Sequence, residues 1–161
     1  MKKFLVYAAI GLGFVSYNVF TQADRDASGA IVSGGTVDAF TIRLGDCFDN
    51  TASLGSDESG EVSSLPGVPC AEPHDYEVYA VFDVEYDAFP GDAAMSERAF
   101  GECLARFEGF VGTVYEESTL DITAMYPSDQ SWNLQDDHEV VCAVYDMNEG
   151  KLTGSAKGSA I

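Results

Sequence analysis

Apolar and polar residues alternate along several short stretches of this chain, and each such stretch predicts a β-strand. Asp38–Leu44 alternates residue by residue, and a Gly45-Asp46 turn separates it from Cys47-Phe48. The strongest strand pattern is Glu77–Val84, which is β-branched, aromatic and nearly continuously apolar. We expect further strands within residues 61–70, 120–125, 139–147 and 152–156.

The segment Asp92–Val111 is the one with clear helical spacing. Its apolar residues recur every three or four positions, so one face of the helix is expected to be buried: Phe100, Cys103, Leu104, Phe107, Phe110 and Val111. Ser96 or Asp92 can cap the start, and Glu97 adds favourable charge to the first turn. The order β-β-β-α-β-β-β predicts an α+β domain, in which one helix packs on a mostly antiparallel sheet.

The N-terminus carries an uncharged stretch, Phe4–Ala23, directly after Lys2 and Lys3. As a helix it would be ~30 Å long, about the thickness of the hydrocarbon core. It is either a cleaved signal peptide or a signal-anchor. We expect an uncleaved transmembrane helix at 1–23, because the run is long and Thr21-Gln22-Ala23 is a poor cleavage site. The lysines place the N-terminus in the cytoplasm and the rest outside, as a single-pass protein of the cell membrane.

Small residues form a stripe on this predicted helix: Ala9, Gly13 and Ser16. Such stripes let transmembrane helices approach closely, so these residues are candidate contacts with a partner helix. Residues 24–37 are polar and rich in Gly, Asp and Ser, and we expect a flexible acidic tether there. Residues 38–161 then form one extracytoplasmic domain without internal repeats.

The charge of the chain limits its partners. It has 8 Lys and Arg against 27 Asp and Glu, for a net charge of −19, so it will not bind nucleic acid through phosphates. Without Lys2 and Lys3, 8 − 2 = 6 basic residues remain against 27 acidic ones, a charge of −21. Such a domain repels anionic lipid headgroups and attracts basic partners or divalent cations. Solubility in a generally acidic proteome is the alternative explanation.

The four cysteines, Cys47, Cys70, Cys103 and Cys142, form no C-x-x-C or Cys/His cluster, which argues against structural zinc. In an exported domain they predict two disulfides with three possible pairings. We expect Cys47–Cys70, which flank one acidic loop, and Cys103–Cys142, which lie on a buried helix face and in an apolar strand. Each would stabilise the fold by roughly 3–4 kcal/mol. A free catalytic thiol is the alternative.

Candidate chemistry is sparse, and we expect a protein that is not an enzyme, without catalytic residues or cofactors. His74 precedes Asp75 and His138 precedes Glu139, pairs that suit acid–base catalysis, but no nucleophile motif accompanies them. Local hydrogen bonding at a strand end explains His74 better than catalysis does. Trp132 lies in a polar stretch, either as an interface anchor or as a plug at the core edge. We therefore take Trp132 and His74 as possible partner contacts.

Metal binding is expected to be weak at most. A loose acidic cluster is the first candidate for divalent cations, although a solvated loop explains it as well: Asp46, Asp49, Asp57, Glu58 and Glu61. Asp146–Gly150 is similar to the opening of a calcium loop but lacks the later bidentate glutamate. A hairpin turn is the expected structure there.

Several motifs together resemble one protein family. They occur in this order: Gly45-Asp46-Cys47-Phe48, Val68-Pro69-Cys70 with Pro73-His74 and Glu77-Val78, Phe89-Pro90-Gly91, Cys103 with Phe107 and Phe110-Val111-Gly112, Tyr126-Pro127-Ser128 with Ser131-Trp132, Val141-Cys142-Ala143 and Leu152-Thr153-Gly154-Ser155. Over residues 42–159 the chain resembles the septum formation family of actinobacterial envelope proteins. One departure is Gln135-Asp136-Asp137-His138, where the family pattern has Gly-Asp-Arg.

This resemblance implies an exported, membrane-anchored domain that acts near cell division or the envelope, and it transfers no catalytic residue. We expect a non-enzymatic binding or scaffold domain in envelope or septum assembly, whose partners are other membrane or envelope proteins. The alternative is an accessory subunit of a larger membrane complex, docked through its transmembrane helix and tether.

Overall fold

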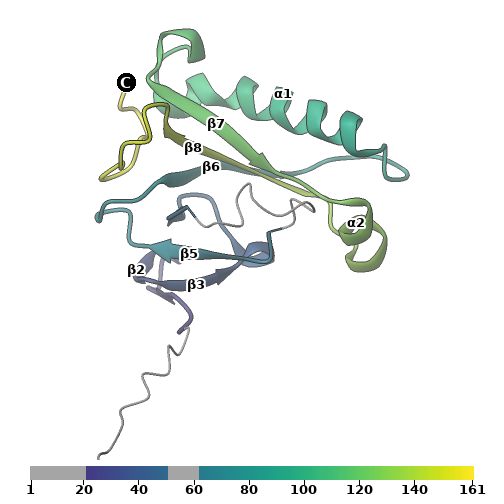
Figure 1. Ribbon diagram of the computed structural model, residues 1–161, viewed down its shortest axis with the longest axis horizontal. Helices are drawn as coiled ribbons and strands as arrows, with labels where there is room; N and C mark the ends of the chain where they lie inside the picture. Colours follow the sequence, from purple (N-terminus) through teal and green to yellow (C-terminus); the bar gives the residue numbers. More distant parts are fainter. Residues whose placement is uncertain (1–20, 51–61) are drawn as a thin grey trace, which may run out of the picture.

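The computed structural model describes residues 21–50 and 62–161 of the chain (Figure 1). Its strands are β1 (Asp24–Arg25), β2 (Ile31–Ser33), β3 (Gly35–Asp38), β4 (Cys47–Phe48), β5 (Ser64–Val68), β6 (Tyr76–Asp83), β7 (Leu120–Met125) and β8 (Glu139–Asp146). Its helices are α1 (Asp92–Val111) and α2 (Asp129–Gln135), with short 3₁₀ helices η1 (Ala39–Thr41) and η2 (Tyr115–Glu117). The predicted α+β class is confirmed.

The main sheet has the strand order β3-β5-β4-β6-β8-β7, and all its neighbouring strands are antiparallel. The two longest strands, β6 and β8, lie at its centre because both are rich in apolar β-branched residues. Their register places Asp83 opposite Glu139, so the end of β6 lies beside the start of β8. A separate small sheet pairs β1 with β2.

Helix α1 covers one face of β6, β7 and β8 (Figure 1). Its buried positions repeat at helical spacing and pack against the sheet: Met95, Ala99, Cys103, Phe107 and Val111. Of the predicted face, Phe100 and Leu104 are instead exposed. The helix ends at Gly112, whose φ of +91° lets its N–H reach Glu108 O at 2.9 Å. The predicted bounds of α1 and β7 agree with the structure.

The opposite face of the sheet is also buried. A second apolar cluster joins Leu65 of β5 and Phe48 of β4 to Val141 of β8. Two strands separate β5 from β8 in the sheet, so this packing requires a strong bend, and β3 and β5 lie beneath the central strands (Figure 1). Gly67 permits the close packing, since a Cβ there would lie 2.5 Å from Val37 Cγ2.

Both predicted disulfides are confirmed. Cys47–Cys70 joins β4 to the loop after β5, across a sequence separation of 23 residues. Cys103–Cys142 links α1 to β8 across 39 residues, and both of its cysteines are fully buried.

The segment 24–37, predicted as a flexible tether, instead holds β1, β2 and most of β3. The Arg25 guanidinium donates two hydrogen bonds to the Asp46 carboxylate, at 2.6 and 2.7 Å. Asp46 is 3% exposed, so this pair fixes the small sheet to the turn before β4. The folded domain therefore begins before Asp38, because a distant carboxylate stabilises a segment whose composition alone favours flexibility.

The predicted transmembrane helix lies almost wholly outside the described residues. Its last residues, Thr21–Ala23, are described, and they pair with Thr36 in β-structure instead of continuing a helix. Among residues 21–50 and 62–161, no helix has the length and apolar character needed to cross a bilayer.

Two other predictions of secondary structure were wrong. Asp38–Leu44 contains η1 rather than a strand, because the Asp38 carboxylate accepts a hydrogen bond from Phe40 N at 2.9 Å and so caps a turn. Leu152 does not form a hairpin with β8 but pairs with His74.

Helix α2 was not predicted at all, although its capping box is visible in the sequence. The Ser128 hydroxyl accepts a hydrogen bond from Ser131 N at 3.1 Å, and Ser131 Oγ accepts one from Ser128 N at 3.0 Å. A serine takes the place of the Glu or Gln usual at the third helical position.

Candidate functional site

An open acidic groove of about 870 Å³ lies where β6 ends and β8 begins. Six carboxylates line it: Asp83, Glu85, Asp87, Asp136, Asp137 and Glu139. They come from two acidic segments, 83–87 and 136–139, which the antiparallel pairing of β6 with β8 brings side by side. The remaining lining residues are Phe40, Val84, Tyr86 and His138.

Helix α2 lies at the end of the sheet where β8 begins (Figure 1). The residues that follow it, 136–139, form one wall of the acidic groove. It ends at Asp136, a non-glycine residue in the left-handed region with φ of 55°, which turns the chain sharply toward β8. The Asp137 carboxylate then accepts a hydrogen bond from Glu139 N at 3.1 Å. The His138 ring lies 3.9 Å from the Trp132 ring, centroid to centroid. Local packing thus fixes the wall before any partner binds.

The six carboxylates receive no ion pair from a lysine or arginine in the described part of the chain. His138 Nε2 lies 3.3 Å from Asp136 Oδ1. Burial raises the pKa of Glu139, and repulsion from Asp83 and Asp137 raises it further. The acidic groove therefore holds negative charge that a cationic group would relieve.

Aromatic rings border the acidic groove. Phe40 is 52% exposed and Tyr86 is 37% exposed, so both present ring surface to a ligand. Arginine and lysine bind well over such rings. The carboxylates do not converge on a point: within residues 21–50 and 62–161, the one group of three or more potential metal ligands lies elsewhere, at Cys47, His74 and Glu77. This geometry suits an extended cationic segment better than a single metal ion.

The two aromatic residues predicted as partner contacts are both buried. Trp132 is 7% exposed and packs near Phe89 and Tyr86, with ring centroids 6.1 and 6.5 Å away. This burial favours the plug at the core edge over the interface anchor. His74 is fully buried, so it presents no surface in the folded domain, and contact of either residue with a partner stays a prediction. The other predicted contacts, Ala9, Gly13 and Ser16, lie outside the described residues.

The loose acidic cluster does not assemble into a cation site in the described structure. Asp46 binds Arg25, and Asp49 lies 2.7 Å from Lys151 Nζ. Asp57, Glu58 and Glu61 lie outside the described residues. The calcium-like segment Asp146–Gly150 is a turn, although not the expected hairpin turn, and its Asp146 carboxylate accepts a hydrogen bond from Asn148 N at 2.6 Å.

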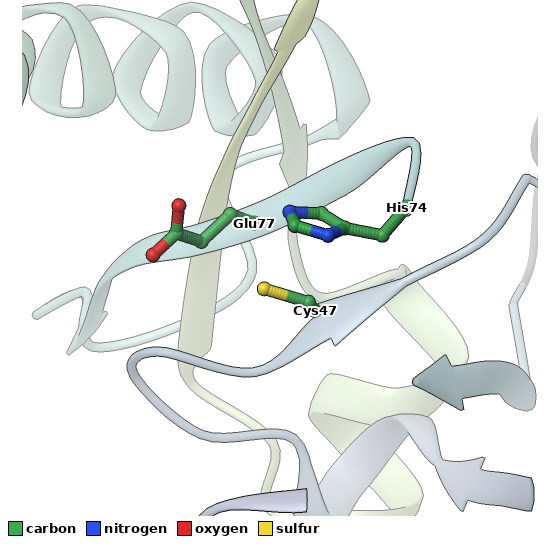
Figure 2. A group of neighbouring side chains, drawn as sticks. All are labelled: Cys47, His74 and Glu77. Atoms are coloured by element: carbon green, nitrogen blue, oxygen red, sulfur yellow. The ribbon is translucent and has the colours of Figure 1, made fainter. Parts of the chain in front are cut away.

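A second group of polar side chains is buried between β4 and β6 (Figure 2). Potential ligand atoms of Cys47, His74 and Glu77 all lie within 4.8 Å of one another. Cys47 and Glu77 are register partners on adjacent strands, which explains their approach. Sequence reasoning missed this group, because the pairing of β4 with β6 is a tertiary fact.

Sequence reasoning also missed the acidic groove, although a signal was present. Asp-Val-Glu-Tyr-Asp at 83–87 follows one predicted strand, and Asp-Asp-His-Glu at 136–139 precedes another. Antiparallel pairing of those two strands would have placed the acidic segments together. The strand order was the missing information.

Together these features define an α+β domain that is cross-linked internally by two disulfides and has an acidic groove at one end of its sheet. The septum formation family matches residues 34–151, and the chain belongs to this family. The resemblance inferred from the motifs is thereby confirmed. No curated protein and no solved structure matches the chain.

Proposed function

We propose that this chain is a non-enzymatic, membrane-anchored extracytoplasmic domain that recruits a basic partner during septum or envelope assembly. Membership of the septum formation family supports a role in cell division or the envelope. The uncharged stretch Phe4–Ala23, which follows Lys2 and Lys3, supports an anchor with the domain outside the cytoplasm.

The acidic groove is the observation that carries the proposal. Six carboxylates without an arginine or lysine partner among the described residues create a negative potential focused between two walls. A lysine- or arginine-rich segment of a membrane or envelope protein complements this charge and can place a cation over Tyr86 or Phe40. A divalent cation shared between the groove and an acidic partner would meet the same electrostatic need.

The arrangement of the histidines supports a role without catalysis. His74 is enclosed in the core, and His138 lies against Trp132 beside Asp136. The lining of the acidic groove contains no serine, threonine or cysteine to act as a nucleophile for His138. The residues that surround the groove are therefore suited to binding.

The test uses the full chain with a C-terminal fluorophore that matures outside the cytoplasm, imaged in dividing cells. The groove variant combines Asp136→Asn, Asp137→Asn and Glu139→Gln. The control variant combines Glu108→Gln and Glu117→Gln, two exposed carboxylates outside the groove. We expect a septal band for the wild type and the control, and an even membrane signal for the groove variant at equal protein level.

Two results would overturn parts of the proposal. A septal band that persists in the groove variant would remove the groove from recruitment. An even signal from the wild type would instead favour an accessory subunit docked through its transmembrane helix, and stable co-purification in mild detergent would then identify the complex.

A further inference from the structure

We propose that Cys47, Cys70, His74 and Glu77 form a zinc site when the Cys47–Cys70 disulfide is reduced, so that Zn²⁺ and the disulfide are alternative closures of the same loop. The proposal is independent of the acidic groove. It rests on the side chains around the start of β4 (Figure 2).

His74 has a buried ring nitrogen that lacks a partner. Its side chain is fully buried, and its Nε2 atom has no hydrogen-bond partner in the structure. Its Nδ1 lies 2.8 Å from Glu72 O, and since a carbonyl only accepts, Nδ1–H is the donor. In the tautomer with the proton on Nδ1, the ring presents a lone pair at Nε2. A backbone carbonyl that orients the other ring nitrogen is the usual support of a metal-binding histidine.

Glu77 is also held in a fixed orientation by neighbouring groups. It is 2% exposed, and its carboxylate accepts hydrogen bonds from Ser155 Oγ at 2.5 Å and Ala156 N at 2.6 Å. These donors fix the orientation of the carboxylate, as groups that hydrogen-bond to a metal ligand do. They leave further lone pairs of the carboxylate oxygens free. A buried carboxylate next to an unpartnered imidazole nitrogen is an arrangement that a cation would stabilise.

The sulfur atoms complete the set. Potential ligand atoms of Cys47, His74 and Glu77 already lie within 4.8 Å of one another, so small shifts suffice for tetrahedral zinc with bonds of ~2.0–2.3 Å. Cys70 is held next to Cys47 by the disulfide and would be the fourth ligand. Two sulfurs, one imidazole and one carboxylate are ligand types that zinc accepts.

The disulfide determines when the site exists, because a sulfur in a disulfide is not a thiolate ligand. A dithiol can reduce the Cys47–Cys70 bond: it gives two electrons and two protons to the two sulfurs and is itself oxidised to a disulfide. Zn²⁺ then binds the two sulfurs as thiolates and displaces those two protons. Cys70 is partly exposed, which gives a reductant access, whereas Cys103 and Cys142 are fully buried.

The first experiment reduces the full chain, in mild detergent, with a phosphine under native conditions, removes the reductant without oxygen, and titrates Zn²⁺ against a chromophoric chelator. We expect one tight zinc per reduced chain and none in the oxidised chain. His74→Gln and Glu77→Gln should each weaken zinc binding at least tenfold. Even the loss of a group that only hydrogen-bonds to a zinc ligand lowers the metal affinity 10–100-fold. Glu139→Gln, a matched change in the acidic groove, should leave the affinity unchanged.

A second measurement needs no variant. Zinc should protect Cys47 and Cys70 of the reduced wild-type chain from alkylation, as mapped by mass spectrometry, and Co²⁺ should give a thiolate-to-metal charge-transfer band. If reduction unfolds the chain, zinc should restore its circular dichroism. The proposal is overturned if the reduced chain takes up no zinc, if zinc neither protects these cysteines nor restores the fold, or if His74→Gln binds zinc as tightly as the wild type.

Discussion

Glu139 shows how the neighbours of one residue set its electrostatics. It begins β8 opposite Asp83, and Asp137 lies two residues before it. Burial, then Asp83 and Asp137, raise its pKa above the ordinary value. The folded state thus holds this proton more tightly than the unfolded state does. Its contribution favours folding at low pH and is lost as the pH rises from the unfolded pKa through the raised folded pKa.

Glu139→Gln should therefore stabilise the domain at neutral pH. The gain should be below about 0.5 kcal/mol, since the side chain is only partly buried and solvent screens its charge. It should disappear below the ordinary glutamate pKa of ~4.3, where the carboxyl is neutral in both states. Thermal unfolding of the wild type and the variant at about pH 7 and about pH 3.5 measures the gain in stability at each pH. Glu108→Gln, which changes an exposed carboxylate, is the control. A loss of stability at pH 7 would show that Glu139 has a favourable cationic partner.

Asp46 shows what a local motif cannot reveal. The Gly45-Asp46 turn was visible in the sequence, and Gly45 does adopt a φ of +84°. The partner of Asp46, however, is Arg25, which is 21 residues away. Its hydrogen bonds to Asp46 raise the pKa of the Arg25 guanidinium. A segment without apolar periodicity is thus part of the folded domain, through this charged pair, the pairing of β3 with β5 and the burial of Ile31 and Val37.

Helix α1 was predictable because its signals are local. Apolar spacing and the glycine directly after the last turn are local signals, and the structure agrees with the predicted bounds. The predicted caps were wrong, because the N-cap is Gly91, which forms no side-chain cap, and the first turn holds Asp92 but not Glu97. Spacing alone does not determine which of these apolar residues are buried. Phe107 is fully buried, whereas Phe100, predicted on the same face, is 40% exposed.

The two phenylalanines give a matched test of packing on α1. Phe107→Ala should cost about 3–5 kcal/mol, because it opens a cavity and removes ring contacts with Tyr79 and Tyr115 at 6.3 and 5.3 Å. Phe100→Ala should cost less than about 1 kcal/mol, since the ring is half-exposed. Chemical denaturation of both variants measures the difference. Equal losses would contradict the burial of the α1 face described here.

Strands and turns were less predictable than α1. Asp38–Leu44 has the alternation of a strand, yet the Asp38 cap stabilises η1 in its place. Leu152 has the pattern of a hairpin partner for β8, but hydrogen bonds to His74 use its backbone instead. Strand formation depends on partners distant in sequence, whereas a helix forms its hydrogen bonds within itself.

At the scale of the whole molecule, net charge and local arrangement make different contributions to binding. The full chain carries −19, and the triple groove variant would still carry −16, three charges fewer. If the general field binds a lysine-rich probe peptide, the variant should bind nearly as well as the wild type. If the acidic groove binds it, removing half of the six carboxylates should weaken binding by at least about tenfold.

Fluorescence anisotropy with a labelled lysine-rich peptide separates these cases. Raising the ionic strength from about 0.05 M to about 0.5 M should weaken wild-type binding strongly, since the Debye length falls to a few ångströms. The Glu108→Gln and Glu117→Gln control should bind like the wild type. Salt-insensitive binding would exclude an electrostatic groove.

The sequence alone determined the family, the α+β class, α1 and both disulfide pairs, because these depend on local periodicity and on a few spaced motifs. Only the tertiary structure decided the bend of the sheet, the place of β1 and β2, and the two side-chain groups from which function is proposed. The acidic groove needs β6 beside β8, and the His74 cluster needs β4 beside β6. Strand order arises from burial and hydrogen bonding over the whole chain, so no local pattern specifies which carboxylates will meet.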